Sequence, residues 1–166
     1  MPNKIASDIN VRRGVTSDLE TITGFNAAMA QETEGKTLDL DCLRSGVSAV
    51  LSDEGLGFYL VAEIAGQVVG QLMVTTEWSD WRNAHFWWIQ SVYVEPGFRR
   101  QGVYRSLDQQ VKDEALNLPG VCGLRLYVDR DNHVAQAVYA GLEMQHSNYD
   151  MYEIDFNETH YERKNG

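Results

Sequence analysis

The residues best suited to chemistry lie between positions 92 and 104, where a β-rich segment passes through a turn into a helical pattern. Arg99, Arg100 and Arg105 fall within seven residues of a chain whose formal net charge is −10. The first amides of a helix lack partners and carry the positive end of its dipole, and Gly102 lets an anion approach them. The turn is therefore predicted to bind a phosphate or pyrophosphate. The alternative is that these arginines form ordinary surface ion pairs.

Two common phosphate-binding motifs do not explain this turn. Gly97 and Gly102 have the spacing of a P-loop, but the next residues are Val103 and Tyr104 instead of lysine and a hydroxyl residue. A nucleoside triphosphatase is therefore not expected. The pattern GxGxxG is absent as well, which argues against a dinucleotide site of the Rossmann type.

The elements that must position this turn can be inferred from apolar spacing. Ser17 and Glu20 have the spacing of a capping box, and the pattern after them predicts a helix to about residue 34. A second helix is expected over residues 40–51. A hairpin is expected from strands 58–64 and 68–75, followed by a loop over 76–84 and a strand over 86–94.

The second half of the chain continues the alternation of helix and strand. Residues 103–115 have helical spacing, residues 124–128 read as a strand, and Asn132 can cap a short helix. Residues 144–156 are expected to form one or two closing strands. The predicted order is β-α-α-β-β-β-α-β-α-β-β.

This order predicts a mixed α/β fold in a single domain over residues 1–156, with a polar tail over 157–166. Hairpins beside strand-helix-strand crossovers predict a mixed, mostly antiparallel sheet of six to seven strands with helices on both faces.

Composition narrows the classes of function. The chain has 166 residues and 43% hydrophobic residues, enough for a core. Its acidity argues against nucleic acid and would suit a cationic substrate, although many soluble proteins are simply acidic. No apolar run reaches the roughly 18 residues of a membrane helix, so no membrane partner is expected. Cys42 and Cys122 are expected to be buried, reduced thiols rather than a disulfide or a metal site, in a cytoplasmic protein.

Two motifs resemble signatures of the GNAT superfamily of N-acetyltransferases. Residues 99–104, Arg-Arg-Gln-Gly-Val-Tyr, resemble its Arg/Gln-x-x-Gly-x-Gly/Ala acyl-CoA pyrophosphate loop, and they follow a strand ending Val-x-Val, as in that family. Thirty residues downstream, Asn132, Ala135 and Tyr139 resemble its second signature. The element order also matches, so the resemblance covers nearly the whole chain. It departs at Tyr104, where the family prefers glycine or alanine, and at Glu143-Met144, where it usually has Gly-Phe.

The resemblance implies direct transfer of an acetyl group from acetyl-CoA to an amine, without a metal. Tyr139 would be the general acid that protonates the thiolate, as a phenol with a pKa near 10 can do. A strand N–H beside Val92 and Val94 would polarise the thioester carbonyl. The residues implied to bind the cofactor are Val92, Tyr93, Val94, Arg99, Arg100, Gln101, Gly102, Val103, Tyr104, Arg105 and Asn132.

The general base and the acceptor are less defined. Some relatives have a carboxylate on the strand before Asn132, where this chain has Tyr127. His85, a water chain, Glu32 and Glu34 remain candidates for the base.

Glu32, Glu34, Trp78 and Trp88 are candidates for binding the acceptor. The alternative for the acidic pair is a solvated helix end. Because neighbours on a strand face opposite sides, Trp87 or Trp88 must face the core.

The sequence therefore predicts an N-acetyltransferase that acts on a primary amine of a small molecule or peptide, with a homodimer as one expected assembly. The alternative is a domain of the same fold that binds acyl-CoA as a sensor without turnover.

Overall fold

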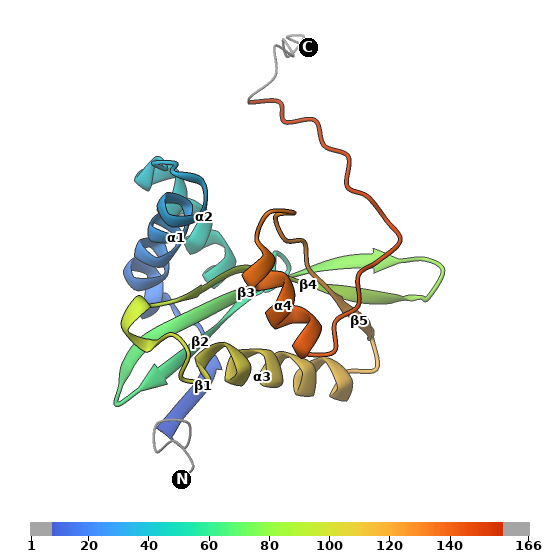
Figure 1. Cartoon of the computed structure of the whole chain (residues 1–166), viewed down its shortest axis with the longest axis horizontal. Helices are drawn as coiled ribbons and strands as arrows, with labels where there is room; N and C mark the ends of the chain where they lie inside the picture. The colour runs from blue at the N-terminus through green and yellow to red at the C-terminus, as the bar shows by residue number, and fades with distance from the viewer. Residues whose placement is uncertain (1–7, 158–166) are drawn as a thin grey trace. The chain divides into compact units, whose positions relative to one another are not determined.

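The computed structural model describes residues 8–157, which divide into one compact unit up to Tyr127 and a second from Val128 (Figure 1). The first unit contains β1 (Ile9–Arg13), η2 (Thr16–Asp18), α1 (Leu19–Glu34), α2 (Leu40–Ser52), β2 (Phe58–Ile64), β3 (Gln67–Ser79), β4 (Ala84–Val94), η3 (Pro96–Phe98), α3 (Val103–Asn117) and β5 (Val121–Arg125). The second unit contains α4 (His133–Gly141). The predicted tail, residues 157–166, lies outside the described residues except for Asn157.

The sheet has five strands in the order β1-β2-β3-β4-β5. Neighbouring strands are antiparallel from β1 to β4, and β5 pairs with β4 in parallel. A parallel pair needs a crossover connection, and α3 provides it. The predicted mixed, mostly antiparallel sheet is confirmed.

Alternating side chains on β2 divide the core between the two faces of the sheet. Leu60 and Ala62 pack in one cluster with residues of α3, whereas Tyr59 and Val61 pack in another with residues of α1 and α2. Successive residues of a strand point to opposite faces, so α3 covers one face and the pair α1 and α2 covers the other. Helices on both faces are therefore confirmed (Figure 1).

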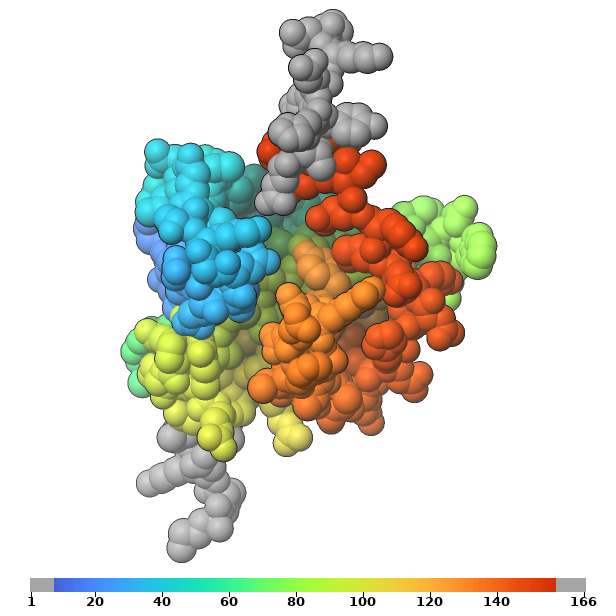
Figure 2. Space-filling model, turned by 45° about the horizontal axis from the view of Figure 1, so that its top comes forward, coloured from blue at the N-terminus to red at the C-terminus, as the bar shows by residue number. Residues whose placement is uncertain are grey.

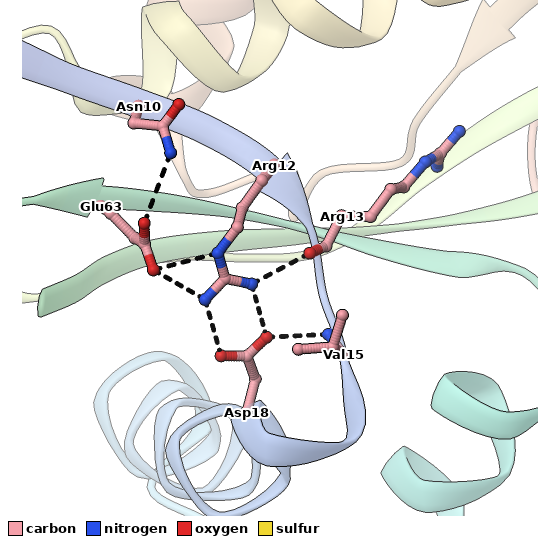
Figure 3. Close-up of polar contacts among 6 residues, drawn as sticks. All are labelled: Asn10, Arg12, Arg13, Val15, Asp18 and Glu63. Atoms are coloured by element: carbon pink, nitrogen blue, oxygen red, sulfur yellow. Dashed lines mark hydrogen bonds and ion pairs between the residues drawn. The ribbon is translucent and has the colours of Figure 1, made fainter. Parts of the chain in front are cut away.

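Arg12 on β1 joins three elements around its guanidinium group (Figure 3). It donates to both carboxylate oxygens of Asp18, at 2.7 and 3.0 Å, and to Glu63 Oε1 on β2, at 2.7 and 3.0 Å. Asp18 also accepts from the Val15 amide at 2.8 Å. Burial alone would raise the pKa of Asp18, but the hydrogen bonds from Arg12 and Val15 bring that pKa below its ordinary value.

This arrangement replaces the predicted capping box, which was wrong. Ser17 lies inside the 3-10 helix η2, and Asp18 is the residue before α1. Glu20 pairs instead with Arg44 of α2, at 2.9 Å. The Arg12 charge fixes Asp18 at this helix start, a long-range effect that local spacing does not reveal.

Two predicted boundaries were wrong in the middle of the chain. The loop expected over 76–84 is largely strand, because Thr76, Glu77, Trp78 and Ser79 extend the pairing of β3 with β4. Only residues 80–83 form the turn. The strand expected at 124–128 lies at Val121–Arg125, since the register of β5 is set by its partner β4.

The one or two closing strands expected over residues 144–156 are not formed, so the sheet has five strands rather than six to seven. The segment has the alternation of a strand, but a strand also needs a partner for its backbone groups. Within the described chain this segment joins no ladder. Its large apolar side chains are exposed, namely Tyr149, Met151, Tyr152, Ile154 and Phe156.

Candidate active site

The second half of β4 offers an open backbone edge. In the described chain, β4 pairs with β5 only from His85 to Trp88, so its later residues pair with β3 alone. A β-bulge interrupts that remaining ladder: Gln71 pairs with Tyr93 and Met73 with Gln90, which leaves two residues of β4 opposite one residue of β3. One of the two, Ser91, has φ of +50°. The open edge and the bulge expose peptide groups that an extended ligand can bind.

This edge leads directly into the turn before α3. Gly102, with φ of +88°, is the residue before α3, and the first bond of the helix runs from the Ser106 amide to the Gly102 carbonyl at 3.0 Å. The three amides before Ser106 consequently have no acceptor within the helix, and the residue before the helix, Gly102, has no side chain that could cap them. Gly70 brings this helix start close to the sheet, because a Cβ there would lie 2.7 Å from Val103. The turn thus has the geometry of an anion site.

The side chains of the turn divide into two groups. Arg100 and Arg105 are exposed and form no ion pair with any residue in the described chain. Gln101 instead holds the turn together, donating to the Gly97 carbonyl at 2.9 Å. Val103 is buried in the core and Tyr104 is half-buried.

Arg99 connects the turn to the end of α1. Its guanidinium lies 2.7 Å from Glu32 Oε2 and its Nε donates to the Val94 carbonyl at 2.8 Å. Tyr93 donates its hydroxyl to the other Glu32 oxygen at 3.1 Å. The hydrogen bond from Arg99 is the main reason that the pKa of Glu32 lies below its ordinary value. Figure 2 shows the end of α1 in blue against the yellow-green segment that carries Arg99.

The structure therefore unites residues that were predicted for different tasks. Glu32 was predicted to bind the acceptor and Arg99 the cofactor, yet the two form one ion pair. Glu34 is exposed, and its carboxylate lies 3.5 Å from the ammonium group of Lys36. Both acceptor roles stay predictions.

Trp87 and Trp88 lie on opposite faces of the sheet, as the alternation of side chains along a strand requires. Trp87 is buried against Phe58, with ring centroids 5.2 Å apart, so the prediction that one of the pair faces the core is confirmed. Trp88 lies on the other face and donates to Glu77 Oε2 at 3.2 Å. Trp78 is about half exposed and packs edge-on against His85 at 4.9 Å.

Sequence reasoning missed Glu77 as a residue of this face. Its carboxylate binds Trp88 and also Arg125 of β5, at 2.6 Å. The loop predicted over 76–84 concealed its position. Continuing the alternation of β3 through Thr75 would have placed Glu77 on the same face as Trp88.

The second unit carries the remaining predicted site residues. Asn132 caps α4, and its Oδ1 accepts from the Ala135 amide at 3.1 Å, which confirms the predicted cap. Tyr139 and Ala135 are both half-buried on this helix. Burial raises the pKa of the Tyr139 phenol. The cofactor contact of Asn132 and the acid role of Tyr139 stay predictions.

Other expectations concern thiols, metals and membranes. Cys42 and Cys122 are free, but both are exposed, so their predicted burial was wrong; Cys122 lies on the edge strand β5 and its Sγ donates to the His85 carbonyl. Residues 8–157 contain no cluster of three or more metal-binding side chains. None of the helices in the same range is long and apolar enough to cross a membrane.

Solved structures show what this chain is similar to. A crystal structure described as a possible acetyltransferase from Clostridium difficile 630 is 46% identical, with a TM-score of 0.85 over 89% of this chain and 97% of that one. Ribosomal-protein-alanine N-acetyltransferase from Brucella melitensis biovar Abortus 2308 has the same fold at 17% identity, with a TM-score of 0.73 over 89% and 99% of the two chains.

A third structure of this fold is AAC(6')-Iy in complex with the bisubstrate analog CoA-S-monomethyl-acetylneamine. It is 17% identical, with a TM-score of 0.71 over 89% of this chain and 97% of that one. No curated protein matches the chain. The acetyltransferase (GNAT) family model matches residues 23–143, most of both described units. Together with the 46% identity over nearly the whole chain, this match shows that the chain belongs to the GNAT family of acetyltransferases.

Proposed function

We propose that this chain transfers the acetyl group of acetyl-CoA directly to a primary amine of a small molecule or peptide. The observation that carries the proposal is the continuity of the open edge of β4 with the uncapped start of α3. An extended edge followed by helix amides that have no acceptor within their helix suits a ligand with an amide-containing arm and a pyrophosphate. Membership of the GNAT family supports the same cosubstrate.

The described residues fit such a cosubstrate. Backbone groups of Val92 and the amide of Val94 would bind the amides of the pantetheine arm, whereas the Val94 carbonyl already accepts from Arg99 Nε. The amides at the start of α3 can bind the pyrophosphate, with Arg100 and Arg105 exposed beside them. A peptide N–H at the β4 bulge would polarise the thioester carbonyl and stabilise the negative charge that develops on its oxygen.

The proposed reaction needs three proton transfers. The acceptor ammonium first loses a proton to a base, for which His85 or a water chain are candidates, because only the neutral amine can attack. The amine nitrogen then bonds to the carbonyl carbon, the carbon–sulfur bond breaks, and Tyr139 gives its proton to the thiolate. The nitrogen, which became positively charged on attack, releases its second proton, and this proton restores the phenol. Burial raises the pKa of this phenol, so it remains protonated at neutral pH and available as an acid.

Relatives of the same fold and the acidic, aromatic face of the sheet support an amine as the acceptor. Two structures of the same fold are described by an alanine N-acetyltransferase activity and by an analog that joins CoA to acetylneamine. Glu77, Trp88 and Glu32 supply carboxylates and an aromatic surface to one face of the sheet.

We also propose a cytoplasmic location, since two exposed free cysteines suit a reducing compartment.

A thiol-release assay tests the proposed function. The protein is incubated with acetyl-CoA and a panel of polyamines, amino acids, aminoglycosides and peptide N-termini, and free CoA and the acetylated product are measured. We expect thiol release that depends on one class of amine, with an equal amount of acetylated product. Tight binding of CoA without release across the whole panel would instead support the acyl-CoA sensor.

A further inference from the structure

The face of the sheet beneath α1 contains a buried polar side chain that packing alone does not require. Gln71 on β3 is completely buried. Its Nε2 donates to Asn26 Oδ1 on α1 at 2.9 Å and to the backbone carbonyl of Ser91 at 3.1 Å. Its Oε1 is buried and accepts no hydrogen bond from any residue in the described chain. Burying an amide with an unsatisfied oxygen destabilises a fold, and an apolar side chain would avoid that penalty.

The Ser91 carbonyl belongs to the β4 bulge. Ser91 has φ of +50°, a conformation that a non-glycine residue adopts only when its surroundings hold it there. The ladder between β3 and β4 is interrupted at this point, so regular strand pairing does not fix the peptide group. The hydrogen bond from Gln71 supplies the missing restraint.

Fixing this carbonyl also fixes the amide that follows it. No cis peptide bond occurs in the described chain. In a trans peptide unit the C=O and the next N–H point in opposite directions. If the Ser91 carbonyl is held toward Gln71 on β3, the Val92 N–H is directed away from β3, on which side β4 has no strand partner.

Asn26 fixes the orientation of the Gln71 carboxamide in turn. Its Oδ1 accepts from Gln71, so the Gln71 NH₂ group and not its oxygen faces both acceptors. Two buried polar side chains, Asn26 and Gln71, therefore connect α1 to the bulge.

We propose that Gln71 is a positioning residue, which fixes the Ser91–Val92 peptide unit so that the Val92 N–H is oriented for the thioester carbonyl. This inference rests on the proposed function and adds a side chain that acts through the backbone. Gln71 itself is not a catalytic residue, because its contacts are to Asn26 and Ser91.

The test replaces Gln71 with methionine, which keeps the unbranched shape and removes both hydrogen bonds. We expect kcat for acetyl transfer to fall about 10- to 100-fold, since losing a single well-placed donor costs 10²–10³ and misalignment less. The KM for acetyl-CoA and the Kd for CoA, which has no thioester carbonyl, should change less than threefold. In amide NMR spectra of the ligand-free protein, the Val92 resonance should move.

Thr23→Val is the matched control. Thr23 is likewise buried on α1, but its Oγ1 has no hydrogen-bond partner in the described chain and so does not restrain the bulge. Its substitution should leave kcat and the Val92 resonance unchanged. If Gln71→Met does not fold, Asn26→Ala serves instead, because it frees the Gln71 carboxamide; its kcat should fall several-fold and Val92 should again shift.

The outcomes separate this inference from the proposed function. A wild type that acetylates no amine contradicts the proposed function, and the Val92 resonance then decides whether Gln71 fixes the peptide unit. If the wild type is active and Gln71→Met changes neither kcat nor the Val92 resonance, only the positioning role is contradicted. Equal losses of kcat and CoA affinity in Gln71→Met and Thr23→Val would also overturn it, because they indicate a general loss of packing.

Discussion

The ion pair between Glu32 and Arg99 changes which arginine is available for a phosphate. Arg99 is held by Glu32 and by the Val94 carbonyl, whereas Arg100 is exposed and unpaired within the described chain. A charged side chain that is already paired must give up that partner before it binds an anion. The contact with the pyrophosphate is therefore expected to depend more on Arg100 than on the residue that opens the sequence motif.

We predict that Arg100→Glu weakens CoA binding. One charge-assisted hydrogen bond contributes about 1.5–3 kcal/mol, and the reversed charge adds repulsion, so Kd should rise at least tenfold. Isothermal titration calorimetry measures this change. Arg82→Glu is the control for net charge, since Arg82 is exposed in the β3–β4 turn. Equal affinities of wild type and Arg100→Glu would show that the pyrophosphate lies elsewhere.

Tyr139 supports a second prediction for a single residue. Tyr139→Phe keeps the ring and removes the hydroxyl, and acid catalysis contributes roughly 10²–10⁴ in rate. We expect kcat to fall at least tenfold, with water as a partial substitute, while KM for acetyl-CoA stays within a few-fold. Tyr149→Phe, the same change at an exposed position of the same unit, should have no effect. If Tyr139→Phe turns over at the wild-type rate where chemistry is rate-limiting, Tyr139 is only a packing residue.

At the scale of helices and strands, the sequence predicted an element correctly where residues close together along the chain determine it. Helical spacing predicted α1, α2 and α3, and two β-rich runs separated by three residues predicted the hairpin of β2 and β3. The predictions were wrong where the existence or the end of a strand depends on pairing with a segment that is distant in the sequence. The end of β3 depends on its register with β4, and residues 144–156 alternate like a strand without joining the sheet.

In the candidate site, too, the sequence predicted the local features and missed the contacts between residues that are distant along the chain. The Gly102 turn and the Asn132 cap are local, and the sequence predicted both. The pairing of Glu32 with Arg99 joins residues 67 positions apart, and Gln71 reaches Asn26 across 45 positions. Such contacts follow from the packing of α1 on the sheet, which spacing along the chain does not specify.

The connection of β1 to α1 through Arg12 gives a prediction about stability and pH. The hydrogen bonds with Arg12 lower the pKa of Glu63, and with Val15 they outweigh burial to lower that of Asp18. The unfolded chain therefore binds more protons than the folded one near pH 4. This stabilisation is present above the ordinary carboxyl values, about 4, and is lost as the pH falls through the folded-state values.

Asp18→Asn should consequently lower the free energy of unfolding at pH 7 by about 1–3 kcal/mol, because Arg12 loses a partly buried ionic partner. The difference from wild type should shrink as the pH falls below 4 and should be lost below the lowered folded-state pKa of Asp18, where its carboxylate is protonated in the folded protein as well. Urea denaturation at several pH values measures both effects. Asp41→Asn is the control, because Asp41 is almost fully exposed, and it should change stability by less than about 0.5 kcal/mol. A pH-independent loss in Asp18→Asn would show that shape and not charge is responsible.

For the molecule as a whole, 24 acidic against 14 basic residues create a negative field. Such a field attracts cations to the surface and is screened by salt, with a Debye length of about 10 Å at 0.1 M. Acidic side chains near the end of α1 strengthen it locally, although Glu32 is neutralised by Arg99 and Glu34 faces the single charge of Lys36. An acceptor with several positive charges would be favoured by this field, whereas an acceptor with a single amine would gain little.

We therefore predict that kcat/KM for a polyamine falls several-fold when NaCl is raised at saturating acetyl-CoA, while the value for a singly charged amine ester changes little. Glu34→Gln should raise the KM of the polyamine more than that of the ester and leave the affinity for CoA unchanged. Glu32→Gln should in addition alter CoA binding, because it releases Arg99 from its ion pair. Steady-state kinetics with both amines at several salt concentrations measure these effects. Identical responses of the two amines to salt and to Glu34→Gln would show that the acidic residues are a solvated surface without a role in acceptor choice.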